Sequence, residues 1–203
     1  PNRDMSTVAI VGSRRATYYG KQVAERLAYE LSRAGVAIIS GLAYGVDAMA
    51  HKGALRAGGH TVGVLGCGVD IVYPQDNLKY YREMAKKGAL VSEFPIGTKP
   101  LPGNFPARNR IISGLSQGVL VVEARQRSGA LITVDYALEQ GRDVFAIPGN
   151  INQPCSYGTN TLIKEGAKLV MKVEDILEEL PDYIMSPKSE TLSMQLDFLE
   201  TQV

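Results

Sequence analysis

The sequence predicts an α/β fold, in which a doubly wound, mostly parallel sheet carries helices on both faces. Short apolar runs rich in Val and Ile suit strands that are buried on both sides. These runs alternate with longer segments whose apolar residues recur at helical spacing. Turns that contain glycine separate the two kinds of segment, as expected for repeated strand–helix units. Together these observations indicate a Rossmann-like sheet.

The first strand–helix unit organises the rest of the chain. Residues 8–11 form a β-branched apolar run that ends at Gly12, and the next helix is expected to stop at Gly35. One stripe of that helix carries five apolar residues: Val23, Ala24, Leu27, Ala28 and Leu31. Further strands are expected at residues 36–40, 61–65, 89–92, 118–122, 144–147 and 168–171. The run at 118–122 is the most hydrophobic and is predicted to be central.

The remaining helices each follow a strand. One begins near Val46. The next, which Asp76 or Asn77 can N-cap, carries Leu78, Tyr81 and Ala85 and is expected to end at Gly88. Residues 94–106 hold four prolines and two glycines, which predicts an ordered loop. Helices are then expected at residues 108–116, 129–140, 157–164 and 173–180. The inward stripes are Ile111, Ile112 and Leu115 in the first of these, and Leu131, Val134 and Leu138 in the second.

The charge distribution favours a polyanionic ligand. The net charge of +1 combines a basic body with an acidic end: residues 1–172 hold 21 Lys/Arg and 13 Asp/Glu, and residues 173–203 hold one Lys and eight acids. Residues 1–180 are predicted to form one domain and residues 181–203 a linker or C-terminal tail. The chain begins at Pro1, so we expect a fragment of a longer protein.

Cysteine and histidine usage argues against a metal site. Cys67 and Cys155 lack C-x-x-C spacing, and His51 and His60 are the only histidines. Free thiols are expected in a reducing compartment. No apolar run reaches the roughly 20 residues that span a bilayer, and no secretory pattern is present. We therefore expect a cytoplasmic protein with no metal, no cofactor and no membrane contact.

The turn after the first strand is predicted to bind a phosphate. Gly12 and Ser13 lead toward a helix start, where free backbone N–H groups attract anions. Arg14 adds a guanidinium that matches phosphate geometry with two parallel hydrogen bonds. The chain lacks both G-x-x-x-x-G-K-[ST] and a complete G-x-G-x-x-G, which argues against a P-loop NTPase and against tight dinucleotide binding.

Three motifs stand out in the sequence. They are Gly12-Ser13-Arg14, Gly41-x-Ala43-x-Gly45-x-Asp47, and Phe-Pro-x-Arg-Asn-Arg-Ile-Ile-Ser-Gly-Leu-Ser at residues 105–116. Together with segments at 123–133, 148–149 and 158–167, they closely resemble the DNA-processing protein A (DprA, or Smf) family. The likeness spans about residues 6–180. The resemblance implies a non-enzymatic, homodimeric protein that binds single-stranded DNA, protects incoming DNA, and helps to load the RecA recombinase in natural transformation and recombination. Some members carry an N-terminal helical domain or a C-terminal winged helix, neither of which is recognisable here.

A sequence-blind binder of single strands needs cations for phosphates and aromatic rings for bases. The residues expected to contact DNA or phosphate are Gly12, Ser13, Arg14, Gly41, Gly45, Lys99, Phe105, Arg108, Asn109, Arg110, Ser128, Gly129 and Thr133. Arg125 and Arg127 can supply further cations. The resemblance places Phe105 at the DNA pocket. Many members carry a basic residue shortly before this Phe, whereas Lys99 lies further back.

Other roles remain open for several of these residues. Arg14 can instead pair with Asp47 or Glu123, both of which are predicted to be structural. Asp47 either N-caps its helix or accepts from neighbouring N–H groups and Arg14. Phe105 is either a stacking ring or a loop anchor buried against Ile111. Arg108 and its neighbour two residues on, Arg110, diverge by about 200° on a helix, so one should face the ligand and the other the protein.

An enzyme acting on a nucleotide phosphate is the alternative function, of the lysine-decarboxylase-like phosphoribohydrolase type. Glu93 and Glu123 both follow strands and could act as a carboxylate pair. That family's Pro-Gly-Gly-x-Gly-Thr loop is absent from this chain.

Self-association is the last expectation, and it rests on the resemblance. A C₂ homodimer would use the late part of the fold, with Leu162, Ile163 and Val170 at the contact. The mass in solution at micromolar concentration tests this expectation.

Overall fold

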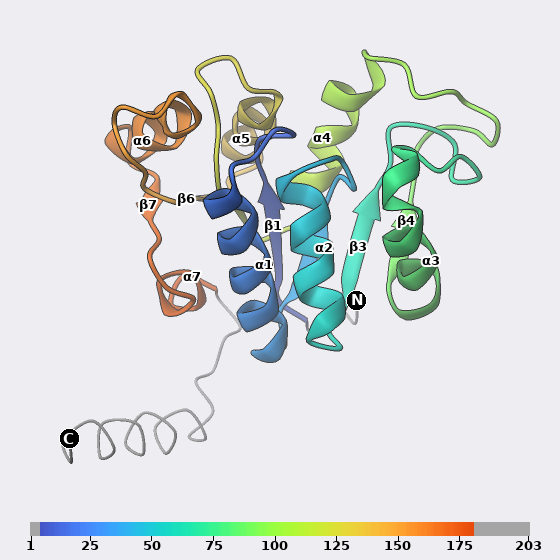
Figure 1. Ribbon diagram of the computed structural model, residues 1–203, viewed down its shortest axis with the longest axis horizontal. Helices are drawn as coiled ribbons and strands as arrows, with labels where there is room; N and C mark the ends of the chain where they lie inside the picture. The colour runs from blue at the N-terminus through green and yellow to red at the C-terminus, as the bar shows by residue number, and fades with distance from the viewer. Residues whose placement is uncertain (1–4, 181–203) are drawn as a thin grey trace.

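A computed structural model describes residues 5–180, which form a seven-stranded parallel sheet with helices on both faces (Figure 1). The strands are β1 (Thr7–Val11), β2 (Ala37–Ser40), β3 (Thr61–Val64), β4 (Ala89–Val91), β5 (Gly118–Val121), β6 (Asp143–Ala146) and β7 (Lys168–Leu169). The helices are α1 (Tyr18–Arg33), α2 (Val46–Arg56), α3 (Leu78–Lys87), α4 (Asn104–Gly114), α5 (Gly129–Glu139), α6 (Tyr157–Lys164) and α7 (Glu174–Leu177). Two 3₁₀ turns precede α3 and α6. The predicted tail, 181–203, lies outside the described residues.

The strand order β4-β3-β2-β1-β5-β6-β7 confirms the doubly wound fold. The chain builds outward from β1 to β4 and then returns to the other side of β1, so the order reverses between β1 and β5. Ligands of such sheets bind beyond the carboxyl ends of the strands at this reversal. The prediction that residues 118–122 are central is wrong by one place. β1 occupies the middle of the sheet, and β5 lies beside it.

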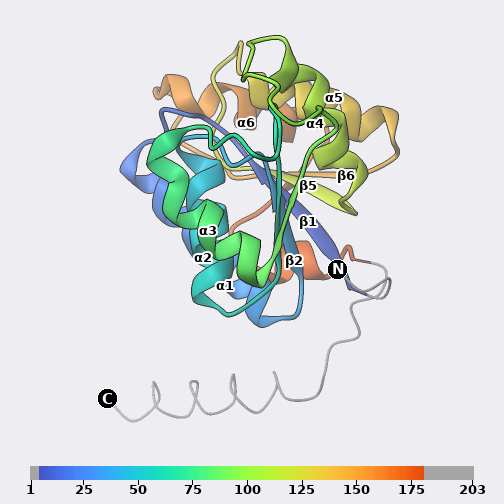
Figure 2. The same cartoon turned by 90° about the vertical axis from the view of Figure 1, so that its right-hand side faces the viewer.

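Alternation along the strands builds two cores, one on each face of the sheet. Val8 and Ile10 face the core formed with α1, α2 and α7, whereas Ala9 and Val11 face the core formed with α4 and α5. Figure 2 shows the sheet between these two groups of helices. The predicted stripe of α1 is entirely buried. No helix among residues 5–180 is both long and apolar enough to span a membrane.

The buried faces of two helices differ in part from the apolar residues that the sequence singles out. In α3 the buried side chains are Tyr80 and Met84, and Tyr81 packs partly buried against a core cluster. In α5 the buried face is mostly small, with Ala130, Val134 and Ala137, while the predicted Leu138 is 63% exposed. Small side chains let α5 lie close to the sheet, so the largest apolar residue does not mark the buried face. Asn77 occupies the N-cap position of α3, as predicted. Its side chain makes no capping hydrogen bond and donates to the carbonyls of Leu42 and Ala43, at 2.9 and 3.2 Å.

The ends of two later elements also differ from the sequence expectation. α4 begins at Asn104, inside the predicted loop, because a proline is tolerated in the first turn of a helix. Its predicted inward residue Leu115 lies after the helix and is exposed. Val170 follows β7 and is fully buried in the core, which excludes it from a dimer contact. The preceding residue, Leu169, is the exposed one.

His51 is a neutral buried residue of α2. Its Nδ1 lies 2.7 Å from Thr61 Oγ1, and the Thr61 hydroxyl donates to Ile38 O at 2.8 Å. The single hydroxyl proton is thereby used, so His51 Nδ1 carries the proton of their shared hydrogen bond. Burial, with a smaller contribution from Arg108, lowers the pKa of His51 to about 3.

This burial makes the fold acid-sensitive. The folded-state pKa lies below the unfolded value of about 6.5, so the unfolded state binds more protons between these values, and stability falls as the pH drops below 6.5. We expect His51→Asn, which keeps a donor for Thr61 but does not titrate, to remove this loss. The difference in unfolding free energy between wild type and variant should narrow by about 2 kcal/mol from pH 7 to pH 5 in urea titrations. A pH-independent difference would contradict the assignment.

Candidate functional site

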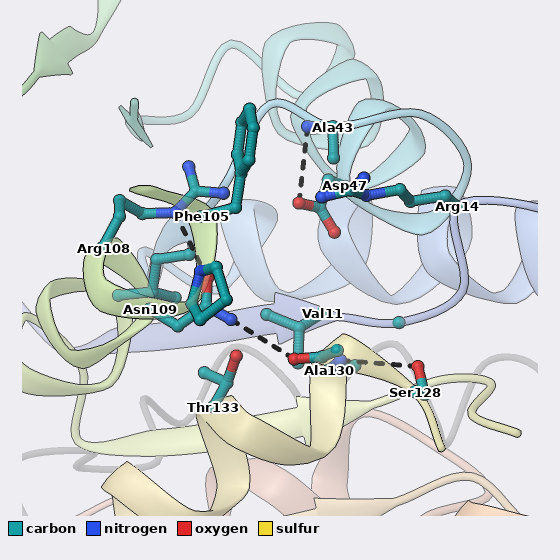
Figure 3. A pocket seen from close by; sticks show the side chains of 14 residues that line it. Val11, Arg14, Ala43, Asp47, Phe105, Arg108, Asn109, Ser128, Ala130 and Thr133 are labelled. Carbon is teal, nitrogen blue, oxygen red and sulfur yellow. Dashed lines mark hydrogen bonds between the residues drawn. The ribbon is translucent and has the colours of Figure 1, made fainter. Parts of the chain in front are cut away.

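An open pocket of about 320 Å³ lies at the reversal of strand order, beyond the carboxyl ends of the strands. Four segments supply its walls: the loop after β1, the loop after β2, helix α4, and the first turns of α5. Figure 3 shows these side chains converging from elements far apart in the sequence. Its lining includes nine predicted contact or structural residues: Gly12, Arg14, Asp47, Phe105, Arg108, Asn109, Ser128, Gly129 and Thr133.

The start of α1, which follows the loop after β1, is occupied by a carboxylate of the protein itself. α1 starts at Tyr18, six residues after Gly12, and the Ser13 N–H already donates to Glu123 O at 2.8 Å. Glu123 is buried, and its carboxylate accepts from Thr17 N at 2.9 Å and from Thr17 Oγ1 at 2.5 Å. The anion at the start of α1 is therefore the protein's own carboxylate. Glu123 thus holds the start of α1, and the N–H groups of Ser13 and Thr17 are already used within the protein.

Gly12 and Gly20 permit the close approach of these segments. A Cβ on Gly12 would lie 2.7 Å from a Val46 methyl and 3.0 Å from Glu123 O. A Cβ on Gly20 would lie 2.4 Å from the Glu123 carboxyl carbon. The role of Gly12 at the pocket is thus to bring the β1 loop against α2, which leaves Arg14 at the rim.

The loop between β2 and α2 is held in one shape by Asp47. Its Oδ2 accepts from the N–H groups of Gly41 and Ala43, at 3.2 and 3.4 Å. Of the two roles open to Asp47, the structure therefore has the acceptor of neighbouring N–H groups; the N-cap of α2 is Gly45, at φ +75°. Leu42 is fully buried with φ +53°, a strained conformation that the surrounding hydrogen bonds must maintain.

Arg108 is the residue that joins the walls of the pocket. It is 3% exposed, and its Nη1 donates to Gly41 O at 3.0 Å and to Val64 O. Its Nε donates to Asn109 Oδ1 at 3.2 Å, and Asn109 Nδ2 donates to Gly129 O at 3.3 Å. One chain of hydrogen bonds thus connects the ends of β2 and β3 with α4 and α5.

The buried charges are shifted toward their neutral forms. Burial lowers the pKa of Arg108 to about 10, opposed mainly by Asp47. Burial also raises the pKa of the Asp47 carboxyl, opposed by Arg108 and by the N–H groups of Ala43 and Gly41. Arg108 remains a cation at neutral pH, with its donors directed at carbonyl oxygens inside the protein.

Arg14 is the exposed cation of the pocket. Among residues 5–180 it has no hydrogen-bond or ion-pair partner, and its guanidinium carbon lies 5.2 Å from the centre of the Phe105 ring. The alternatives in which it pairs with Asp47 or Glu123 do not occur. Phe105 is half-buried, with its ring against Gly66 and 5.5 Å from the Tyr73 ring. It is therefore not an anchor against Ile111. Phe105 lines the pocket, with the guanidinium groups of Arg14 and Arg108 over its ring.

The first turns of α5 form the opposite wall. Ser128 is the N-cap, and its Oγ accepts from Ala130 N at 3.4 Å. Thr133 is 1% exposed but lines the pocket. The N-terminus of this helix faces the same space as Arg14 (Figure 3), and its dipole favours an anion there.

Five predicted contact residues are not part of the pocket wall: Ser13, Gly41, Gly45, Lys99 and Arg110. Gly41 lies behind the wall, where its N–H donates to Asp47 and its carbonyl accepts from Arg108. Arg110 is exposed and forms an ion pair with Glu93, so Arg108 faces the pocket and Arg110 faces away from it. Lys99 is exposed on the loop before α4 and is not part of the pocket wall. Ser13 and Gly45 shape the loops behind Arg14: Val46 N donates to Ser13 O at 3.3 Å. Ser13 is therefore part of the loop framework rather than of the wall.

Sequence reasoning missed Gly66 and Tyr73. A Cβ on Gly66 would lie 2.8 Å from the Phe105 ring, so only glycine leaves room for the ring in this position. The signal was the Gly66-Cys67-Gly68 turn directly after the third strand, which places a close approach at the same sheet edge.

The carboxylates of the alternative, enzymatic hypothesis do not form a pair in the pocket. Glu93 binds Arg110 and Glu123 holds the start of α1; neither belongs to the pocket wall. In the part of the chain that the structure describes, no group of three or more His, Cys, Asp or Glu is placed to hold a metal ion.

Arg108 of α4 binds buried carbonyl groups, whereas Arg110 forms an exposed ion pair. Matched substitutions of the two should therefore differ in their effect on stability. Arg108→Lys removes the fork that reaches two carbonyls and should lower the free energy of unfolding by about 2–4 kcal/mol. Arg110→Lys changes only an exposed ion pair and should cost less than about 1 kcal/mol. Urea denaturation monitored by circular dichroism measures both, and equal losses would show that Arg108 does not hold the pocket walls together.

Comparison with known proteins shows longer relatives that match most of this chain. It is 50% identical over 175 residues to the DNA processing protein DprA of Bacillus subtilis, covering 86% of this chain and 59% of that protein. The X-ray structure of DNA processing protein A from Streptococcus pneumoniae superposes with a TM-score of 0.82 at 46% identity, covering 87% of this chain and 62% of that one.

A further structure describes a single-stranded DNA binding mode of DNA processing protein A from Helicobacter pylori. It matches with a TM-score of 0.78 at 35% identity, covering 84% of this chain and 78% of that one. The chain spans about three-fifths of the Bacillus relative. A family model for the DNA recombination-mediator protein A matches residues 1–181, and the chain therefore belongs to the DNA recombination-mediator protein A family.

Proposed function

We propose that this chain binds single-stranded DNA without catalysis, through the pocket formed by the β1 loop, α4 and α5. The observation that carries the proposal is Arg14, an exposed guanidinium without a hydrogen-bond or ion-pair partner in residues 5–180, set over the Phe105 ring. Family membership supports it, as does the single-stranded DNA binding mode of the Helicobacter relative.

The chemistry of the pocket fits a nucleotide unit of a single strand. Arg14 and the N-terminus of α5 both attract a phosphate. Phe105 offers a ring to a base, and stacking on an aromatic ring tolerates every base. The buried guanidinium of Arg108 is held by carbonyl oxygens, so it contributes positive field and rigidity rather than a direct contact. Contact residues proposed on these grounds are Arg14, Phe105, Asn109, Ser128, Gly129 and Thr133.

The biological setting is proposed from the family. The chain would protect incoming DNA and help to load RecA during natural transformation and recombination, in the cytoplasm. We also propose that it forms a homodimer through the α6 region, where Leu162 and Ile163 are partly buried and Leu169 is exposed. Two pockets in one dimer would add avidity on a long strand. The hydrolase alternative is not favoured, because both of its carboxylates are already used in structural contacts.

Removal of the Arg14 side chain tests the proposal. We expect Arg14→Ala to weaken binding of a fluorescein-labelled thymine oligonucleotide at least tenfold, because a charge-assisted hydrogen bond is worth about 1.5–3 kcal/mol. Fluorescence anisotropy at fixed, moderate salt measures the affinity. Arg15→Ala is the matched control, since Arg15 is the adjacent exposed arginine and does not line the pocket.

The same titration with a duplex shows whether the pocket selects single strands. Duplex bases are stacked on one another and cannot reach Phe105, so wild type should bind the single strand more tightly. If Arg14→Ala and Arg15→Ala lose the same affinity for the single strand, Arg14 contributes only through general surface charge. Unchanged affinity in Arg14→Ala would refute binding at this pocket.

A further inference from the structure

A second hollow lies beside the pocket, on the same edge of the sheet. Its walls are residues 125–127, which follow β5, residues 151–154, which follow β6, and Tyr157, the first residue of α6. Because β5 and β6 are parallel, the loops at their carboxyl ends meet at one edge. Figure 1 shows the loop after β5 at the top of the molecule, between α6 and α5. We refer to this feature as the β5–β6 hollow.

The cations of the β5–β6 hollow are free. Arg125 and Arg127 are exposed, and neither has an ion-pair or side-chain hydrogen-bond partner among residues 5–180. Two other exposed arginines are held in ion pairs instead: Arg56 binds Glu25, and Arg110 binds Glu93. Two unpaired guanidinium groups that are two residues apart in the chain form a set of donors that suits phosphate oxygens.

Apolar and aromatic surface adjoins these cations. Tyr157 is 52% exposed and Ile151 is 88% exposed, next to the amide side chains of Gln126 and Asn152. An exposed ring flanked by arginines is the combination that single-strand binders use, with stacking of a base on the ring worth about 1–3 kcal/mol.

The backbone holds this hollow in a fixed shape. Ala124 N donates to Cys155 O and Gly158 N donates to Ala124 O, both at 2.8 Å. A Cβ on Gly158 would lie 2.8 Å from Ala124 Cβ, so the glycine permits this contact. The loop that carries the two arginines is thus fastened to the start of α6, which carries the tyrosine, before any ligand arrives.

The hollow and the pocket share one loop. Arg127 lines the hollow and the next residue, Ser128, lines the pocket, so their Cα atoms are about 3.8 Å apart. Ser128 N donates to Arg125 O at 3.1 Å, which closes a turn between the two. A strand that leaves the pocket over the N-terminus of α5 reaches the β5–β6 hollow next.

We propose that the β5–β6 hollow is a second contact site for the same DNA strand, in which Arg125 and Arg127 bind phosphates and Tyr157 stacks on a base. This inference rests on the proposed function and extends it, because it gives the path of the DNA strand from the pocket to the β5–β6 hollow. The arginines face solvent and hold nothing inside the protein, so their removal leaves the fold intact.

Salt dependence of binding tests the two arginines in the full chain. With a thymine oligonucleotide of about 16 nucleotides, we expect Arg125→Ala/Arg127→Ala to reduce the slope of log Kobs against log salt concentration by about 1.4, since each phosphate contact contributes about 0.7 on a single strand. With a single thymidine nucleotide, the unit that the pocket fits, the slope should be unchanged. Arg33→Ala/Lys87→Ala is the charge-matched control, because these exposed residues end α1 and α3 at the opposite edge of the sheet.

Substitution of Tyr157 separates stacking from charge. Tyr157→Phe should retain affinity for the long oligonucleotide, and Tyr157→Leu should lose about fivefold or more. Equal slopes for wild type and the double arginine variant, with Arg14→Ala still impaired, would overturn the second site and leave the proposed function standing. Unchanged binding in Arg14→Ala would overturn the proposed function and this inference together.

Discussion

The pocket depends on one buried guanidinium. Arg108 donates from α4 to carbonyls at the ends of β2 and β3, and through Asn109 it reaches the first residue of α5. A buried cation is costly unless its donors are satisfied, and here carbonyl oxygens and the nearby Asp47 carboxylate supply that compensation. The result is a set of loops that cannot move independently. Leu42 keeps its strained backbone inside this framework. Phe105 lies one turn before Arg108 on α4, and the Arg14 guanidinium lies over its ring.

A second constraint decides which cation meets the ligand. In many strand–turn–helix units the helix N-terminus receives a phosphate, but here Glu123 occupies the start of α1. The position that the fold usually gives to a ligand is therefore taken by a structural carboxylate. The groups at the pocket that can attract an anion are instead the Arg14 side chain and the N-terminus of α5. Helix α5 lies on the other side of the reversal in strand order. This arrangement suits a chain of phosphates that runs along an edge better than one pyrophosphate held in a tight turn.

Sequence patterns predicted the sheet well because each signal was local. Every expected strand and helix exists within residues 5–180, since β-branched runs, helical stripes and glycine turns are set by neighbours in the chain. Tertiary packing decided what the sequence got wrong. α4 begins before Pro106, within a stretch that the sequence predicted to be a loop. Small residues of α5, rather than Leu138, face the sheet. At the short strand β7, Val170 is buried and Leu169 is exposed. The divergence of Arg108 and Arg110 followed from helix geometry, but which one turns inward depended on carbonyls distant in the sequence.

The most direct measurement of the central claim is a crystal structure of the chain with a short thymine oligonucleotide. It should place a phosphate within hydrogen-bond distance of the Arg14 guanidinium, a base against the Phe105 ring, and the side chain of Arg108 still bonded to Gly41 and Val64. An oligonucleotide ordered elsewhere on the molecule, with the pocket at the strand reversal free of nucleotide, would contradict the account.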